Sequence, residues 1–322
     1  MHESQWAGQS VGGGYGLCLI KRDSGFTIIE LMVAMVIGLV MMLFVIQLYL
    51  SISASYRLHD DNLRLHQDGR YAMQLMETNL RQAGFGNLSS TDINAALVDR
   101  TDFVDEEGNP GRGLRGCDHG YNKPMMSPPD FSCSSGTGAA AFEVAYRVSD
   151  DFDSLSGAGA DCNGAKAKTY VLPATHPAYL VNKPVHIVAN LFFVATPARS
   201  KIASLYCNGN GGTIAQPLLD NVENLRLLYG VAANGGSSVQ QFLSAADVDA
   251  LSSDQLVNWR RVVSVKLCLQ IVGAKHNTTE PQHYTDCDGV DRTAKDHKLR
   301  AVLTSVTMLR NSAGSAGAGV DN

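Results

Sequence analysis

Residues 21–34 read Lys-Arg-Asp-Ser-Gly-Phe-Thr-Ile-Ile-Glu-Leu-Met-Val-Ala, and this stretch leads into a long apolar run. From Leu31 to Tyr56 there is no charged residue and no histidine. A run of about 20 apolar residues is long enough to span a bilayer as a helix. Lys21 and Arg22 precede it, and basic residues at that position keep the N-terminus cytoplasmic. We therefore predict a single membrane-spanning helix, with the remainder of the chain exported.

Two other N-terminal signals predict the same orientation, and the residues disfavour both. A cleaved secretory signal has a shorter apolar run, followed by a small-x-small cleavage site. After Leu50 the chain reads Ser-Ile-Ser-Ala-Ser-Tyr and continues a helical pattern, so no such site is evident. A lipoprotein signal needs a small residue before its cysteine, whereas Leu17 precedes Cys18.

The apolar run continues without a break into an amphipathic helix. Its apolar positions recur at helical spacing while charged residues occupy the positions between them, so one face is available for packing. No proline interrupts the helix, and Gly84 is its stop signal. A helix from Phe26 to Ala83 would be about 87 Å long at 1.5 Å per residue. The apolar positions of the second half are Leu58, Leu65, Ala72 and Met76.

The chain beyond Phe85 is predicted to be rich in β-strands and loops. Residues 142–148 and 263–271 alternate apolar and polar side chains, which is typical of half-buried strands. Residues 301–309 are also strand-like. Residues 185–195 are nearly all apolar and are predicted to form a strand, with a short buried helix as the alternative that periodicity leaves open. Residues 244–259 carry a helical pattern. We expect an α+β protein whose long N-terminal helix packs on a C-terminal antiparallel β-sheet domain with loop insertions.

The junction at residues 21–34 resembles a type IV prepilin. Prepilins have a basic leader that ends in glycine, then phenylalanine, and then a glutamate at the fifth mature position within an apolar helix. Here these positions are Gly25, Phe26 and Glu30. The resemblance implies cleavage between Gly25 and Phe26 on the cytoplasmic face, followed by methylation of the new Phe26 amine.

Glu30 has a physical role in this interpretation. A lone ionised carboxylate is costly inside a bilayer or a dry bundle of helices. The resemblance implies that the freed Phe26 amine of a neighbouring subunit neutralises it. The carboxylate would then set the register of assembly, because a subunit at the wrong height leaves the charge unpaired.

Several blocks further along the chain are similar to the PilW family of minor pilins, and they occur in that family's order. The resemblance implies a type IV pilin-like fold with a cleaved leader over residues 1–25 and a helix over 26–84. The helix divides into an apolar part, 26–56, and an amphipathic part, 57–84. A β-rich periplasmic domain then covers 85–311, and a tail over 312–322 is expected to be disordered. The similar blocks are residues 80–85, 190–194, 204–207, 216–225 with 229–231, 259–263 and 307–311.

The resemblance also implies a function. Such minor pilins help to prime assembly of the type IV pilus, in a complex at its tip, and so support twitching motility, adhesion and DNA uptake. Expected partners are other minor pilins, the major pilin, the prepilin peptidase and methylase, the inner-membrane assembly platform and a large tip adhesin. The expected location is the inner membrane with a periplasmic domain, and the pilus tip or cell surface after assembly. A pseudopilin of type II secretion is the alternative, and neighbouring genes would separate the two.

The cysteines are consistent with export. Removal of the leader takes away Cys18 and leaves an even number, which favours three disulfides in an oxidising compartment. Six cysteines permit 15 pairings. Sequential pairing is preferred, because short loops close more readily than long ones. The candidate pairs are Cys117 with Cys133, Cys162 with Cys207, and Cys268 with Cys287.

Enzymatic, metal-binding and nucleic-acid-binding functions find little support. The formal net charge is −5, the chain has no G-x-S-x-G or H-E-x-x-H motif, and no C-x-x-C pair suggests zinc. Residues 159–166 resemble a phosphate loop, but alanine stands where that motif needs lysine. The turn at 232–236 lacks the carboxylates that a calcium site needs. We therefore expect no catalytic residue, metal, cofactor or direct nucleic-acid contact. The weaker alternatives are a periplasmic hydrolase, which would use His176 and His186, and a DNA-binding pilin, which would use Trp259-Arg260-Arg261 and residues 295–300.

Overall fold

The computed structural model describes residues 25, 27–85, 113–125, 130–148, 159–170, 185–212, 214–233, 236–276 and 278–310. The sequence-based expectations on the leader up to residue 24, with Lys21 and Arg22, on Phe26, on His176 and on the tail 312–322 therefore lie outside the described residues. The chain forms two compact units, Met1–Ala54 and Ser55–Asn322, and each is described by itself.

Helix α1, Ile28–Gln82, contributes to both units. Its part within the first unit is apolar and exposed on all sides, and the helix is long and apolar enough to cross a membrane, as judged by length and composition. The helix ends where Gly84 adopts a φ of 69° and the backbone N–H of Phe85 donates to the carbonyl of Gln82. A glycine with positive φ just after the last turn is a common helix terminator. The predicted long helix with a glycine stop is confirmed.

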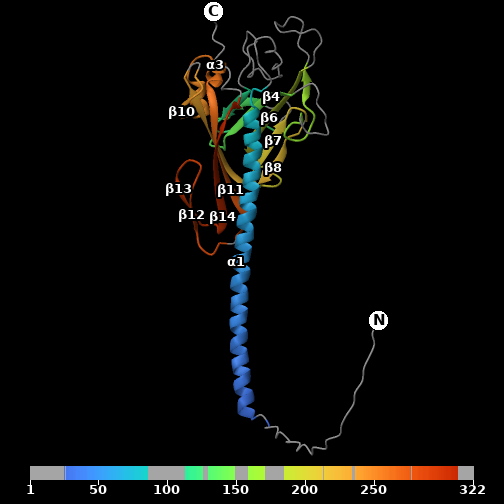
Figure 1. The fold of residues 1–322 in the computed structure, drawn as a ribbon, viewed down its shortest axis with the longest axis vertical. Helices are drawn as coiled ribbons and strands as arrows, with labels where there is room; N and C mark the ends of the chain where they lie inside the picture. Colours follow the sequence, from blue (N-terminus) through green and yellow to red (C-terminus); the bar gives the residue numbers. More distant parts are fainter. Residues whose placement is uncertain are drawn as a thin grey trace, which may run out of the picture. The chain divides into compact units, whose positions relative to one another are not determined.

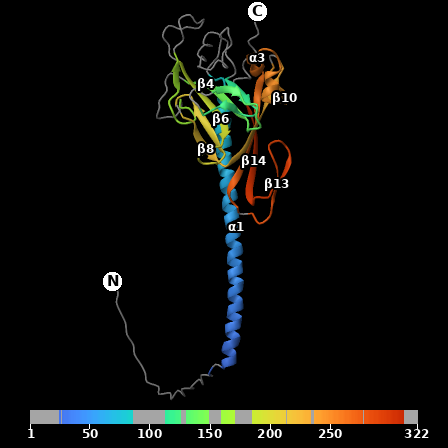
Figure 2. The same ribbon diagram turned by 180° about the vertical axis from the view of Figure 1, so that it is seen from behind.

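The domain contains two antiparallel sheets that lie beside the last part of α1 (Figures 1 and 2). In the first sheet the strand order is β1-β4-β6-β7-β8, with β5 also paired to β6. In the second sheet the order is β10-β9-β11-β14. The first-sheet strands are β1 (Leu114–Cys117), β4 (Ala141–Val148), β5 (Lys168–Tyr170), β6 (Val185–Ala195), β7 (Ser204–Gly209) and β8 (Gln216–Asp220). The second-sheet strands are β9 (Val222–Ala232), β10 (Val239–Leu243), β11 (Val262–His276) and β14 (Lys298–Met308).

Two small hairpins and two short helices complete the described part of the domain. The hairpins are formed by β2 (Tyr121–Lys123) with β3 (Asp130–Cys133), and by β12 (Gln282–Thr285) with β13 (Asp291–Ala294). The helical pattern of residues 244–259 resolves into α2 (Ala245–Asp249) and α3 (Gln255–Arg260). The pattern divides into two helices because Ser244 and Asp254 each cap a separate helix with their side chains. The strands predicted from alternation form as β4, β11 and β14, and the apolar run of residues 185–195 forms β6.

The second half of α1 packs on both sheets. Against the second sheet, Gly69 lies so close that an added Cβ would be 2.7 Å from Ile271 Cδ1 and 2.8 Å from Leu303 Cδ1. Against the first sheet, Asn190 Nδ2 on β6 donates to Asn79 Oδ1 over 2.7 Å in the interior. Three of the four positions expected from the amphipathic spacing are buried, while the fourth, Leu58, is half-buried. The buried helix residues are Leu65, Gly69, Ala72, Met73, Met76, Asn79 and Leu80.

Candidate functional site

The first turn of α1 places Glu30 in a reciprocal capping arrangement with Thr27. The backbone N–H of Thr27 donates to Glu30 Oε2 over 2.9 Å, and the Thr27 hydroxyl donates to the same oxygen over 3.0 Å. In return, the backbone N–H of Glu30 donates to Thr27 Oγ1 over 3.2 Å. This is the capping box, in which threonine at the N-cap and glutamate three residues later satisfy backbone donors at the helix start.

The capping box occupies one of the two oxygens of the Glu30 carboxylate. One oxygen of Glu30 is held by its own helix end, where the helix dipole also favours a negative charge. Among the described residues, the other oxygen, Oε1, has no hydrogen-bond partner. The side chain is therefore fixed in place and can still accept a hydrogen bond from a cation that arrives from outside the chain.

Sequence reasoning missed this arrangement, although the signal was present. Thr27-Ile28-Ile29-Glu30 fits the T-x-x-E pattern of a capping box directly before an apolar run. Gly25, the residue expected before the cleavage point, is exposed, and a Cβ added there would have no heavy atom within 4 Å. Within the described residues, nothing from the fold therefore shields Gly25 from an enzyme.

The apolar surface that follows Glu30 is unusually exposed for a folded chain. Every residue from Ile28 to Ile52 is exposed, so the apolar side chains of this stretch are not covered by any other described residue of the first unit. Exposed apolar surface of this extent indicates a membrane or other protein as its normal surroundings. Gly38 has open space where a side chain would be.

Three disulfides hold the domain together: Cys117–Cys133, Cys162–Cys207 and Cys268–Cys287. This is the sequential pairing that the sequence favoured. The first joins β1 to β3, the second joins a loop to β7, and the third joins β11 to the turn of the β12–β13 hairpin. Among the described residues, no group of histidine, cysteine, aspartate or glutamate side chains is arranged to hold a metal ion.

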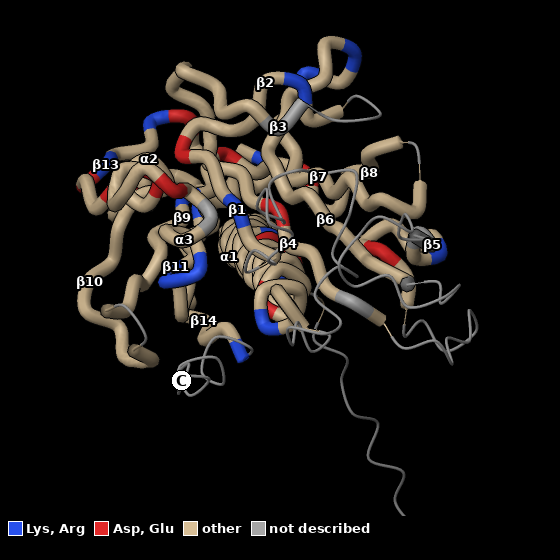
Figure 3. Tube along the Cα trace, turned by 90° about the horizontal axis from the view of Figure 1, so that it is seen from above, with Lys and Arg blue, Asp and Glu red and all other residues tan. Residues whose placement is uncertain are grey.

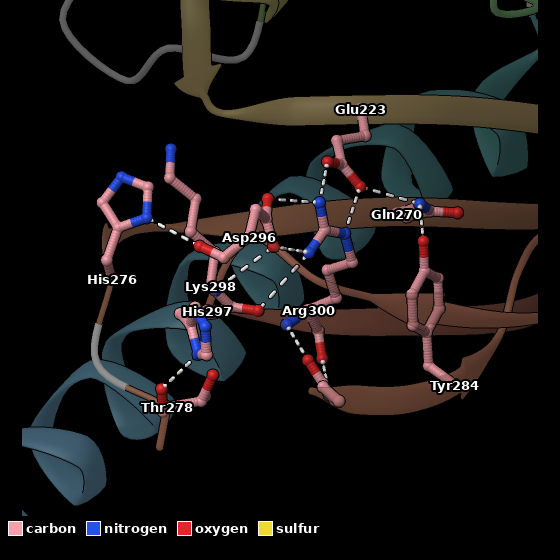
Figure 4. A network of polar contacts seen from close by, with 10 residues as sticks. Glu223, Gln270, His276, Thr278, Tyr284, Asp296, His297, Lys298 and Arg300 are labelled. Atoms are coloured by element: carbon pink, nitrogen blue, oxygen red, sulfur yellow. Dashed lines mark hydrogen bonds and ion pairs between the residues drawn. The ribbon is translucent and has the colours of Figure 1, made fainter. Parts of the chain in front are cut away.

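A polar network around Arg300 fastens that hairpin to the second sheet (Figure 4). Arg300 on β14 forms ion pairs with Glu223 and Asp296, both at 2.8 Å, and its guanidinium lies over the ring of Tyr284 from β12. Gln270 Nε2 donates to Glu223 over 2.8 Å. The hydrogen bonds from Arg300 hold the pKa of Asp296 below its ordinary value. Arg300, Glu223 and Asp296 pair with one another within the domain, so these charges stabilise the fold.

A second carboxylate supports the turn of the same hairpin. Burial alone would raise the pKa of Asp286, but hydrogen bonds from Arg292 and from the backbone N–H groups of Val290 and Asp288 outweigh it, and the pKa is lowered. Asp286 therefore remains ionised and holds the loop that contains Cys287. This is a structural role.

The weaker candidates for catalysis and nucleic-acid binding are used within the fold. Asp161 accepts hydrogen bonds from the backbone N–H groups of Asn163, Ala165 and Gly211, so the loop that resembles a phosphate loop already binds a carboxylate. The indole of Trp259 is buried and donates to Asp249, and Arg261 donates to the carbonyl of Ala232. In Figure 3, basic and acidic positions of the described chain are interspersed. His186 is half-buried on β6.

Comparison with known families agrees with these features at both ends of the chain. Residues 20–46 match the prokaryotic N-terminal methylation motif, and residues 191–311 match the family of Type IV Pilus-assembly protein W, PilW. Among solved structures, a type IV-like pilin from Thermus thermophilus is similar at 12% identity, with 78% of this chain and 98% of that chain covered and a TM-score of 0.39. A search of curated proteins returns no match.

Proposed function

From the premise that this chain is a minor pilin of the PilW family, we propose that it helps to prime assembly of the type IV pilus in the complex at the pilus tip. One observation carries the proposal. A long apolar helix, exposed on all sides and begun by a capped carboxylate, is joined to a disulfide-bonded domain. A pilin is a structural subunit, so the function is assembly and not catalysis.

Processing is the first step of the proposed function. Cleavage after Gly25 would free the amine of Phe26, which is then methylated, and the motif match over residues 20–46 supports this. Thr27 keeps its backbone N–H after such a cleavage, so the capping box with Glu30 can persist in the mature subunit.

Anchoring and export form the second step. The apolar part of α1 would hold the subunit in the inner membrane until assembly, with the N-terminus in the cytoplasm. Three disulfides in the domain support an oxidising compartment, which for such a protein is the periplasm.

Assembly is the third step, and Glu30 has two partners in it. Its own helix end binds one carboxylate oxygen, while the amine of a neighbouring subunit would bind the other. A subunit at the wrong height would leave the outward oxygen unpaired in apolar surroundings, which is costly. Twitching motility, adhesion and DNA uptake would then depend on the pilus that results.

Co-purification tests the proposal. The full chain should be isolated from membranes of cells that make its sibling subunits, and other minor pilins and the major pilin should accompany it. Deletion of the chain should reduce surface pili without reducing the amount of major pilin. Recovery of type II secretion pseudopilins in place of pilins would contradict the proposal and support the alternative.

A further inference from the structure

The edges of the two sheets differ in how they are protected from pairing with other chains. Three of the four terminal strands are short: β1 has four residues, and β8 and β10 have five each, with Pro217 in β8. The fourth, β14, has 11 residues. Natural sheets usually protect edges by short strands, proline, charge or bulges. β14 is the exception among the described strands.

After its first three residues, β14 carries none of the charges, prolines or bulges that usually protect an edge strand. From Ala301 to Leu309 there is no charged residue, glycine or proline. Its register with β11 is regular from Arg300 to Met308, without a bulge. Segments of this kind, with high β-propensity and no charge, are the ones most prone to pair with another strand.

The backbone of β14 is set for such pairing. Leu309 donates its N–H to the carbonyl of Val263, so the odd-numbered residues of β14 bond to β11. The even-numbered residues therefore direct their N–H and C=O groups to the free side of the strand. These are Val302, Thr304, Val306 and Met308, and no described strand pairs with them there.

The side chains on the outer face of this edge are also uncovered. Val306 is 54% exposed and Met308 is 53% exposed. Across the sheet from Val306 lies Lys266 on β11, and beyond it Leu228 on β9, which is exposed as well. Lys266 has no ion-pair partner among the described residues, whereas Arg226, its diagonal neighbour on β9, is paired with Asp288.

The inner side of the same edge carries a second unpaired cation. An open groove of about 280 Å³ lies between α1 and β14, lined by Arg70, Met73, Gln74, Glu77 and residues 303–305. Glu77 is paired with Arg81 in an ion pair of 3.0 Å. Arg70, in contrast, has no acidic partner within the described part of the chain. One basic side chain therefore flanks β14 on each face, at the level of residues 303–306.

We propose that the free edge of β14 receives an extended strand from another pilus subunit, which carries carboxylates on adjacent residues that face Arg70 and Lys266. Adjacent residues of a strand point to opposite faces, so two neighbouring acidic residues can reach the two cations. The added strand would satisfy the free N–H and C=O groups and cover Val306 and Met308, in the manner of β-augmentation. The naming of a pilus subunit as the source rests on the proposed function.

Two other occupants fit less well. The edge of a second copy is uncharged over residues 301–309 and offers no carboxylate to either cation. The chain's own tail, residues 311–322, contains three glycines and a single acidic residue, Asp321. Glycine is unfavourable in strands, so the tail is a poor strand former. Charge complementarity therefore favours an acidic strand from a different subunit.

Crosslinking identifies the occupant directly. The full chain, produced in cells that contain the sibling subunits, would carry a photoreactive amino acid at Thr304, with Arg199, an exposed residue after β6, as the control position. We expect Thr304, and not Arg199, to crosslink to an acidic extended segment of another pilus subunit. Crosslinks only to a second copy, only to residues 311–322, or to nothing would overturn the proposal.

Substitutions test the chemistry of the edge in the same cells. Arg70→Glu and Lys266→Glu place like charges against the partner, and each should lower co-purification of the partner subunit about tenfold. Arg70→Lys and Lys266→Arg should keep it, as should Arg199→Glu. Thr304→Pro removes a free-edge N–H without breaking a bond to β11, and it should lower co-purification as well.

Two readouts keep the edge proposal separate from the proposed function. Thermal unfolding of each purified variant establishes that the domain is folded. If the unchanged chain brings down no pilus subunit, the proposed function fails. If it does, and all the charge-reversal and proline variants bring down as much as the unchanged chain, the edge proposal alone fails.

Discussion

The two halves of α1 have the same backbone but opposite relations to their surroundings. From Ile28 to Ile52 every residue is exposed, whereas from Leu65 onward one face is buried against the two sheets. The second half obtains its packing from its own chain. Among the described residues of its unit the first half has no such partner, and exposed apolar surface of this extent indicates lipid or other protein as its surroundings. One helix thus combines a part made for assembly with a part made for folding.

Blocking cleavage after Gly25 should have the largest effect, because the exposed first half of α1 would then keep its leader and could not assemble. Gly25→Val puts a branched side chain at the expected cleavage point, and the precursor should remain roughly 2.5 kDa heavier, the mass of a 25-residue leader. Surface pili should be lost. Immunoblotting and electron microscopy measure both outcomes, and a protein of mature size from this variant would show that the cleavage site lies elsewhere.

Reduction of the disulfides should have the next largest effect, and it should act on the folding half. Each bond contributes about 2–4 kcal/mol, compared with a total stability of about 5–15 kcal/mol, so the loss of all three should abolish cooperative unfolding. The bonds span 16, 45 and 19 residues.

A paired comparison sharpens the disulfide prediction. Replacing Cys162 and Cys207 with serine should cost about 0.8 kcal/mol more than replacing Cys268 and Cys287, because the longer loop gains more entropy in the unfolded chain. Calorimetry of the two double variants measures the difference. Equal stabilities would show that native contacts of the loops, and not chain entropy, decide the effect.

Alanine substitution of one glycine in each half of α1 should have opposite effects on stability. Gly69→Ala forces a Cβ against Ile271 and Leu303, and it should cost about 1–3 kcal/mol by overpacking. Gly38→Ala meets nothing, and it should favour the helix by up to about 1 kcal/mol. Denaturant unfolding measures the first and helix content in detergent the second. A neutral Gly69→Ala would mean that the contact with the second sheet relaxes freely.

The two roles of Glu30 can be separated by a smaller change. Glu30→Gln keeps a side chain that can complete the capping box but removes the charge, whereas Thr27→Val keeps the charge and removes the cap. Loss of the cap should cost about 1 kcal/mol of helix stability and leave assembly largely intact. Membrane insertion should survive in both variants, and also in Glu30→Ala. Co-purification of Glu30→Gln with neighbouring pilins equal to that of the unchanged chain would contradict a role for the charge in register.

Acidification should have the smallest effect, confined to the β12–β13 hairpin. The pKa values of Asp286 and Asp296 are lowered in the folded protein. Their contribution is therefore complete above the unfolded pKa of about 3.9 and is lost as pH falls through the lower folded values. The melting temperature should decline below about pH 4, and Asp286→Asn should flatten that decline. A pH profile unchanged by this substitution would contradict the assignment.

Much of the fold could be predicted from sequence, because its signals are local. The long helix follows from an apolar run and a glycine stop, β4, β11 and β14 follow from alternation of side chains, and β6 follows from a short apolar run. The cysteines pair sequentially, as expected from the lower cost of closing short loops. The division of residues 244–259 into two helices was missed, although Ser244 and Asp254 are ordinary capping residues.

The candidate site was predicted only in part. Glu30 was identified from the resemblance of residues 21–34 to a prepilin junction, but its bond to Thr27 was not foreseen. The hydrogen bond between Asn79 and Asn190 joins residues that are 111 positions apart, and no local pattern indicates it. The alternation of β14 predicted a strand, but not that its even-numbered residues would face an open edge.

The sequence by itself determined the anchor, the capped helix start, the long helix and the strands, because each depends on residues that are near neighbours in the chain. Only the tertiary structure decided which strand lies at an edge and which charges remain unpaired. No local sequence signal distinguishes Arg70 and Lys266 from Arg226 and Arg300. Among the described residues, however, the fold brings acidic partners only to Arg226 and Arg300. Pairing between distant residues depends on sheet order and register, which the local pattern of side chains does not specify.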